Sequence, residues 1–200
     1  MIHSSKRLNE FEVIIMEYKN DYADRKKEIV WKCLDVFTKK GLVSTTSRDL
    51  SAALNLQNAG IYYYFKSKDD LVIACAEEAA ITMETQLIAP LINQLNDPDE
   101  MVNRLRKKAD EFAPLMRFLA QAFATPKYHE KLIPTLSDIS KRYRRYAEKF
   151  AEALNTNVET IEPYVYIGIT AATNYMIFGD NSFIKPQFDL IKQQLKQFSG

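Results

Sequence analysis

Residues 46–71 read TSRDLSAALNLQNAGIYYYFKSKDDL, and this stretch decides the fold. Thr46 and Asp49 have the spacing of a capping box, in which a hydroxyl and a carboxylate satisfy free backbone amides at a helix start. Ser67 and Asp70 repeat the pattern. The two boxes predict one helix that begins close to Thr46 and another that begins close to Ser67.

A short helix is expected between these two helices. Asn55 marks the turn before it, because asparagine tolerates the left-handed backbone conformation better than most residues. The short helix should begin at Gln57 or Asn58 and run to about Tyr64. It is expected to bury Ile61 and Phe65 against Leu34, Phe37 and Leu54, and to leave Gln57, Asn58, Tyr62 and Tyr63 more exposed.

The chain before residue 46 is also expected to be helical. Asp21 or Asp24 can cap a helix with one apolar face, and Gly41 can end that helix in a left-handed conformation. Residues 1–20 form an extension whose apolar side chains can share one helical face, so it is either a short extra helix or disordered at its start. The expected organisation is an extension over 1–20, a first domain over 21–70 and a second over 71–200.

Composition predicts an all-α protein with a real core. Hydrophobic residues make up 46% of the chain, while five glycines and seven prolines leave most of it free to form helices. Lysine plus arginine total 27 against 26 aspartate plus glutamate, so the whole molecule has no net attraction to nucleic acid or membrane. Cys33 and Cys75 exclude a disulfide framework and suit a reducing compartment.

The remaining chain is expected to form long helices. Their boundaries are predicted at Pro90, Asn96-Asp97-Pro98, Pro114, Thr125-Pro126, Asn155 to Asn157, and Gly179 to Lys185. Neither a signal peptide pattern nor a run of about 18 apolar residues is present, so a cytoplasmic protein without a membrane partner is expected. The helix that begins near Ser67 should pass directly into the second domain, which predicts a stiff junction.

Three helices with a short turn between the second and third fit a helix-turn-helix. The segments 46–50, 54–56 and 61–71 closely resemble the signature of the tetracycline-repressor (TetR) family, and the resemblance extends from about Arg25 to Ala76. The sequence departs from that signature at Asn55, where glycine is usual, and at Gln57, where serine or threonine is usual. The resemblance implies a helix-turn-helix DNA-binding domain followed by a helical domain that binds a ligand and dimerises.

Candidate DNA contacts follow from this resemblance and from side-chain chemistry. Carried over by position, the resemblance implies phosphate contacts from Thr46, Ser47, Tyr62, Tyr63 and Lys68. Arginine can bridge the O6 and N7 atoms of guanine and an amide can pair with adenine, so Arg48, Gln57 and Asn58 are expected to contact base edges. Ala59 and Gly60 would permit close approach, whereas Tyr64 and Phe65 are assigned to packing.

The C-terminal helices predict a homodimer. A helix from about Glu159 to Phe178 has little polar surface on any side, so it should face its own domain and also a partner subunit. Gly168, Ala171 and Ala172 would allow close helix approach. Residues 187–198 would supply a second helix to a four-helix seam like the one that the family uses.

An effector site is expected between the helices of the second domain. Candidate lining residues are Met116, Phe123, Tyr143, Tyr146 and Tyr175. Packing in the core is the alternative role for each of them. The resemblance implies that an unidentified small molecule, apolar or aromatic, releases a repressor from its double-stranded operator DNA.

An enzyme is the competing class of protein. The sequence has no phosphate-binding glycine loop, no spaced cluster of metal ligands, and only His3 and His129 as histidines. We therefore expect no catalytic residue, no metal and no cofactor. An architectural or division-associated DNA-binding protein on the same fold remains an alternative that would need no small ligand.

Overall fold

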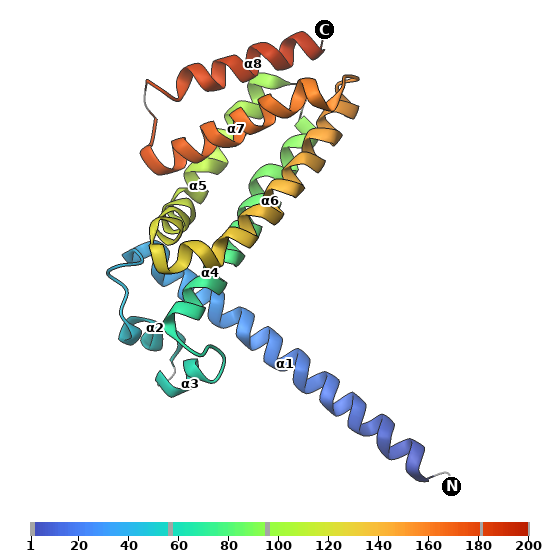
Figure 1. Ribbon diagram of the computed structural model, residues 1–200, viewed down its shortest axis with the longest axis vertical. Helices are drawn as coiled ribbons and strands as arrows, with labels where there is room; N and C mark the ends of the chain where they lie inside the picture. Colours follow the sequence, from blue (N-terminus) through green and yellow to red (C-terminus); the bar gives the residue numbers. More distant parts are fainter. Residues whose placement is uncertain (1–2, 56–57, 95–96, 181, 200) are drawn as a thin grey trace.

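The structure is a computed structural model that describes residues 3–55, 58–94, 97–180 and 182–199. Over these residues the chain forms α-helices, one π-helical turn and one 3-10 segment, without a strand (Figure 1). The all-α prediction is confirmed. The elements are α1 (His3–Lys40), α2 (Ser47–Leu54), α3 (Asn58–Tyr62), α4 (Lys68–Met83), η1 (Glu84–Ile88), η2 (Ala89–Gln94), α5 (Pro98–Ala124), α6 (Pro126–Ala153), α7 (Val158–Phe178) and α8 (Lys185–Ser199).

Helix α1 is one continuous helix of 38 residues. The expected helix start at Asp21 or Asp24 is therefore wrong. Because no glycine or proline occurs between His3 and Lys40, no residue in this span breaks the backbone hydrogen-bond pattern. Figure 1 shows the N-terminal part of α1 extending away from the rest of the molecule. Gly41 ends the helix with a φ of 83°, as predicted.

We call the described residues between 21 and 70 the head. Its core contains Phe37 of α1, Leu54 of α2 and Ile61 of α3, all at most 5% exposed. Ile61 and Phe65 are both buried, as predicted, although Phe65 follows the end of α3. Burial of each such side chain contributes about 1.5–3 kcal/mol to folding, so packing fixes the short helices that could not persist alone.

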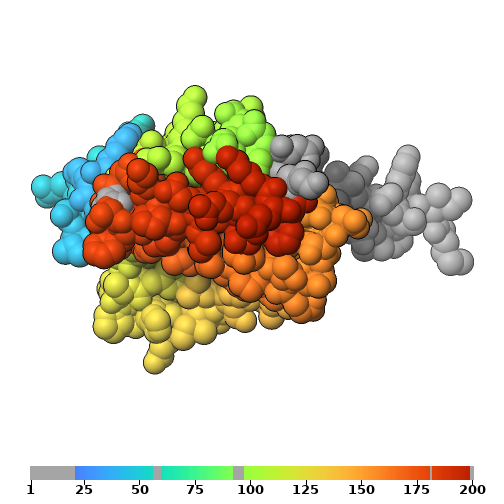
Figure 2. Space-filling view, turned by 90° about the horizontal axis from the view of Figure 1, so that it is seen from above, coloured from blue at the N-terminus to red at the C-terminus, as the bar shows by residue number. Residues whose placement is uncertain are grey.

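We call the described residues after 70 the C-terminal domain. Helix α7 packs against α5 and α6, and α8 packs on α5 and α7. Figure 2, seen from above, shows α8 spread over this domain. The predicted boundaries at Pro98, at Thr125-Pro126 and before α7 are confirmed, because a proline or a capping Asn157 begins each helix there.

Pro114 does not end a helix, so that predicted boundary is wrong. Helix α5 continues through it, as α6 continues through Pro134 and α7 through Pro163. A proline removes one backbone hydrogen bond, but α5 buries Ala113 just before Pro114 and Phe118 one turn later. Packing on both sides of the proline thus holds the helix together.

The helix that starts as α4 changes its winding at Glu84, within the C-terminal domain. It continues as the π-helical turn η1 and then as the 3-10 segment η2, which contains Pro90. Glu84 begins the π turn and is only 4% exposed. Its carboxylate pairs with Arg142 and accepts a hydrogen bond from the hydroxyl of Tyr146 at 3.2 Å. This pairing offsets the cost of a buried charge and fixes η1 against α6.

Among the helices of the described residues, none combines the length and the apolar composition that crossing a membrane requires.

Candidate nucleic-acid interface

The turn between α2 and α3 has the geometry that the sequence predicts. Thr46 caps α2: its hydroxyl accepts from the amide of Asp49 at 3.3 Å, and the Asp49 carboxylate accepts from the amide of Thr46 at 2.8 Å. Asn55 adopts the left-handed conformation with a φ of 51°. These contacts fix the start and the end of α2. Helix α3 ends at Tyr62, two residues earlier than expected.

Three of the predicted phosphate contacts lie together. Ser47, Tyr62 and Lys68 line one small hollow of about 10 Å³ between α2, α3 and α4, whose other lining residues are the buried Leu50, Ile61 and Leu71. Tyr62 is 47% exposed there. Hydroxyl and ammonium groups that share one surface can donate to neighbouring phosphate oxygens of a DNA strand. The structure thus brings together residues from three separate helices that the sequence could relate only by resemblance.

The other predicted DNA contacts do not line this hollow, and the structure describes the side chains of only some of them. Thr46 and Arg48 are exposed at the start of α2. Gln57 lies outside the described residues. Asn58 and Ala59 begin α3, but their side chains are also outside what the structure describes.

Lys68 also makes a hydrogen bond within the head. Its ammonium donates to the carbonyl oxygen of Thr45, a buried residue whose own hydroxyl donates to the carbonyl of Gly41 at 2.7 Å. An ammonium group has three donors, so this bond leaves capacity for a phosphate. Lys68 therefore ties the start of α4 to the loop before α2.

Sequence reasoning missed the ion pair between Lys40 and Asp49, whose atoms Nζ and Oδ1 lie 2.5 Å apart. Lys40 and the two bonds from Thr46 hold the pKa of the Asp49 carboxyl well below its usual range. The pair joins the end of α1 to the first turn of α2. Only the tertiary fold shows this ion pair. The sequence has several lysines on α1, and nothing in it indicates which of them lies close to Asp49.

Tyr22 of α1 forms an aromatic cluster with Tyr63 and Tyr64. The ring of Tyr22 stacks on Tyr64 with centroids 5.0 Å apart and meets the edge of Tyr63 at 5.9 Å. Tyr63 is still 60% exposed. The packing role expected for Tyr64 agrees with this contact, and Tyr63 combines a packed ring with an exposed position beside α3.

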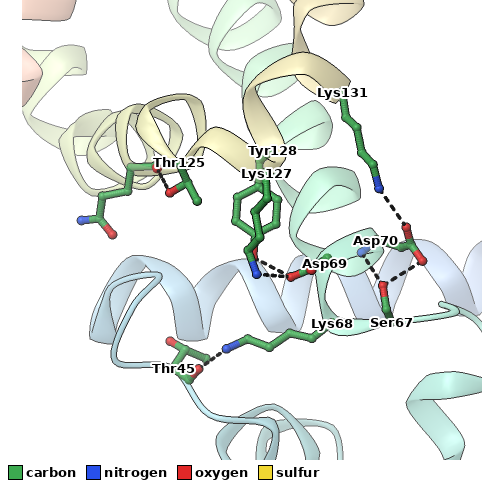
Figure 3. A network of polar contacts seen from close by, with 10 residues as sticks. Thr45, Ser67, Lys68, Asp69, Asp70, Thr125, Lys127, Tyr128 and Lys131 are labelled. Atoms are coloured by element: carbon green, nitrogen blue, oxygen red, sulfur yellow. Dashed lines mark hydrogen bonds and ion pairs between the residues drawn. The ribbon is translucent and has the colours of Figure 1, made fainter.

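The head is held against the C-terminal domain by a polar contact at the start of α4 (Figure 3). The carboxylate of Asp69 accepts from the Lys127 ammonium and from the Tyr128 hydroxyl, both at 2.7 Å. Asp70 faces Lys131 at 3.9 Å. Lys127 and Tyr128 lower the pKa of Asp69, while Asp69 raises the pKa of Lys127 to about 12.

A second contact joins the two domains on the α1 side. The ring of Phe37 stacks on Phe118 of α5 with centroids 5.2 Å apart. The backbone amide of Leu42 donates to the side-chain oxygen of Gln121 at 2.9 Å. The head is thus attached by α4 and also by the corner where α5 meets α6.

Comparison with known families identifies the head. Residues 33–75 match the family model described as bacterial regulatory proteins, tetR family. The head is a TetR-family DNA-binding domain. Its α2, turn and α3 are the helix-turn-helix, and α3 is the helix that such domains place in the major groove. A comparison of the chain with curated proteins finds no match.

Solved structures share the fold of the TetR-type head and the C-terminal domain together. A transcriptional regulator described as TerR/AcrR family, from Aquifex aeolicus VF5, is 18% identical with a TM-score of 0.55, over 86% of this chain and 98% of that one. A tetR-family regulator from Streptomyces coelicolor is 14% identical with a TM-score of 0.58, over 86% and 80%. The multidrug binding protein EbrR, complexed with imidazole, is 16% identical with a TM-score of 0.55, over 86% and 94%.

The five candidate effector-site residues are distributed over the helices α5, α6 and α7. Met116 and Phe123 on α5 are half-buried against the core. Tyr143 and Tyr146 on α6 have ring centroids 6.5 Å apart, and burial together with the nearby Glu84 charge raises the pKa of Tyr143 to about 12. The hydroxyl of Tyr175 on α7 donates to Asp110 at 2.8 Å.

The described residues contain no group of three histidine, cysteine or acidic side chains arranged to hold a metal ion. Cys33 and Cys75 are buried in the head and the start of the C-terminal domain. Burial raises the pKa of the Cys33 thiol to about 12. Both side chains therefore pack as small apolar groups instead of reacting as thiolates.

Proposed function

We propose that the protein is a ligand-responsive, sequence-specific repressor that binds double-stranded operator DNA as a homodimer in the cytoplasm. The position of Ser47, Tyr62 and Lys68 around one small hollow on a TetR-type head carries this proposal. These three side chains would bind phosphates and fix the register of α3 on the duplex. Arg48, exposed beside them, is the candidate for a bidentate contact to guanine.

The exposed apolar residues of the last two helices support a homodimer. Tyr166 and Phe178 of α7 and Leu190 of α8 are large apolar side chains with at least 38% of their surface exposed, and Phe183 between the helices is 80% exposed. Phe178 and Phe183 line one common hollow, and exposed apolar surface of this kind is usual where proteins associate. Paired copies of α7 and α8 would bury it in a symmetric four-helix seam.

A small apolar or aromatic effector is part of the proposal. The solved relative described as a multidrug binding protein was obtained with a small ring compound, imidazole. Its fold likeness supports a small-molecule effector in this chain as well. An effector would change the affinity for DNA by about 5- to 150-fold if it couples as other allosteric ligands do.

DNA selected from a random pool by the wild-type protein would test the function. We expect dimeric, salt-sensitive binding to the selected sequence, measured by fluorescence anisotropy over a salt series. Arg48→Ala should weaken this binding by about 5- to 150-fold while it changes binding to scrambled DNA far less. Arg104→Ala, which removes an exposed arginine of α5, is the matched control.

Equal affinity for selected and scrambled DNA would contradict sequence-specific regulation and favour an architectural role. An Arg104→Ala effect as large as that of Arg48→Ala would show that charge alone, without base contacts, explains the binding.

A further inference from the structure

A groove of about 570 Å³ lies where α1 of the head meets α4, η1 and α5 of the C-terminal domain. Binding sites for small molecules usually have volumes of about 300–1,000 Å³, so this groove has the size of a ligand site. Its lining includes none of the five effector-site candidates and none of the residues around the hollow on the head. It is therefore separate from both of those sites.

Two aromatic rings give the groove an apolar wall. Trp31 of α1 is 38% exposed, and Phe112 of α5 is half-buried. Among the described residues, neither ring takes part in a ring–ring or cation–π contact. A ligand ring can therefore stack on them, and a ligand cation can lie over them.

Thr82 of α4 places a buried hydroxyl in this groove. Thr82 is only 6% exposed, and its backbone carbonyl accepts from the Thr85 hydroxyl at 3.3 Å, but its own hydroxyl has no hydrogen-bond partner in the part of the chain that the structure describes. Thr45 and Glu84, the other buried polar residues there, are both paired. A buried hydroxyl without a partner destabilises the fold, so a ligand that bonds to Thr82 would remove this cost.

Negative charge and hydrogen-bond acceptors dominate the polar part of the groove. The carboxylates of Asp35 and Glu111 line it together with one ammonium, that of Lys39, so two negative charges face one positive charge. Each carboxylate pairs with a lysine of its own helix, but the pairs are at least half exposed and a ligand cation can compete with them. Pro114 has no amide hydrogen, so the carbonyl oxygen of Asp110, which points toward it, lacks its helical donor.

We propose that this groove binds an aromatic ammonium ion, a molecule that carries a protonated amine on a short chain beside an aromatic ring. The ring would lie against Trp31 and Phe112. The ammonium group would donate to the Thr82 hydroxyl and face the carboxylates of Asp35 and Glu111. An anion would meet like charge in the same groove, and an uncharged ring would gain nothing from the carboxylates. This binding does not depend on the proposed function.

The fluorescence of Trp31 tests the site, because Trp31 is the only tryptophan of the chain. The probe is 2-phenylethylammonium, and 2-phenylethanol and phenylacetate are matched controls with the same ring. We expect a saturable change in Trp31 emission with the ammonium ion, an affinity about tenfold lower for the alcohol, and no saturable change with phenylacetate. No saturable change with the ammonium ion would overturn the site, and equal affinity for the alcohol would overturn the ligand class.

Two threonines provide matched variants. Thr82→Val keeps the shape of the side chain without its hydroxyl and should weaken binding of the ammonium ion about tenfold, whereas Thr85→Val, outside the groove, should leave the affinity unchanged. Without ligand, the Tm of Thr82→Val should equal or exceed that of the wild type, because the fold loses no hydrogen bond. A lower Tm with unchanged affinity would show that the hydroxyl serves the fold, and would overturn its role in binding.

Two acidic residues of α5 test the charge. Glu111→Gln removes a carboxylate from the groove and should weaken binding about two- to fivefold. Glu100→Gln removes a carboxylate that is also paired with a basic residue of α5 but lies outside the groove, and it should have no effect. Equal losses in these two variants would show that overall charge attracts the ammonium ion. That result, or binding that Thr82→Val and Glu111→Gln both leave unchanged, would overturn the site.

Discussion

The head and the C-terminal domain are both helical, but different kinds of interaction position their helices. In the head, side chains at the helix ends set the geometry: Thr46 caps α2, Asn55 turns the chain, and Ser67 caps α4. In the C-terminal domain, helices run through prolines, and contacts between distant residues such as Glu84 and Arg142 set the geometry. Local sequence therefore specifies the surface that would contact DNA, while tertiary packing specifies the region that would sense a ligand.

Removal of the Glu84 charge should have the largest effect of three changes that test this contrast. Glu84→Gln keeps the size of the side chain but leaves Arg142 without its counter-charge, so we expect a loss of about 2 kcal/mol in the free energy of unfolding. Urea denaturation measures it. Glu100→Gln breaks the exposed pair with Arg104 and should cost at most about 0.5 kcal/mol. Similar losses in the two variants would contradict the structural role of the buried pair.

Loss of the cap on α2 should have a smaller effect that stays in the head. Thr46→Ala removes the hydroxyl that accepts from the Asp49 amide, and this should cost about 1 kcal/mol. Hydrogen exchange should rise at the α2 amides while those of α7 remain protected. Thr46→Ser keeps a hydroxyl and should restore most of the protection. Equal acceleration in α2 and α7 would show that the cap is not a local determinant.

The contact of Asp69 with Lys127 and Tyr128, which joins the two regions, should have the smallest effect on stability. This effect should depend on pH. Lys127 and Tyr128 lower the pKa of Asp69 in the folded protein below the ordinary value of 3.8. The contact therefore stabilises the fold above the ordinary pKa, and this stability is lost as the pH falls through the lowered value. Solvent screens the part-exposed pair, so the contribution is small.

Asp69→Asn should flatten the decline in Tm between about pH 5 and pH 2 relative to wild type. Lys127→Gln removes the partner instead of the acid and should flatten it in the same direction. A decline as steep as that of the wild type in both variants would contradict a stabilising role for the contact.

These differences explain what the sequence could predict. The sequence predicts every feature that depends on a few neighbouring residues. These are the caps at Thr46 and Ser67, the left-handed conformations of Asn55 and Gly41, and the burial of Ile61. The same reasoning placed Ser47, Tyr62 and Lys68 in one interface only through a family resemblance, since three helices must fold before they meet.

Other features depended on longer-range packing. Asp21 and Asp24 have the chemistry of caps, but a capping side chain does not start a helix where the preceding residues are already helical. Pro114 has the chemistry of a helix breaker, yet buried residues on both sides carry α5 through it. An apolar cavity lined by residues of η1, η2 and α5 to α8, Gly168 among them, combines residues whose spacing in the sequence shows no common pattern.

The attachment of the head at two places has a genetic consequence. Because both α4 and the α5–α6 corner hold it, the head follows the C-terminal domain instead of swinging from one helix. In the proposed dimer, residues that do not contact DNA would then determine which spacing between operator half-sites the protein accepts. Suppressors that let the protein accept half-sites one base pair closer or farther apart should map to Phe118, Gln121 or Tyr128, while changes in the preferred bases should map to α2 and α3.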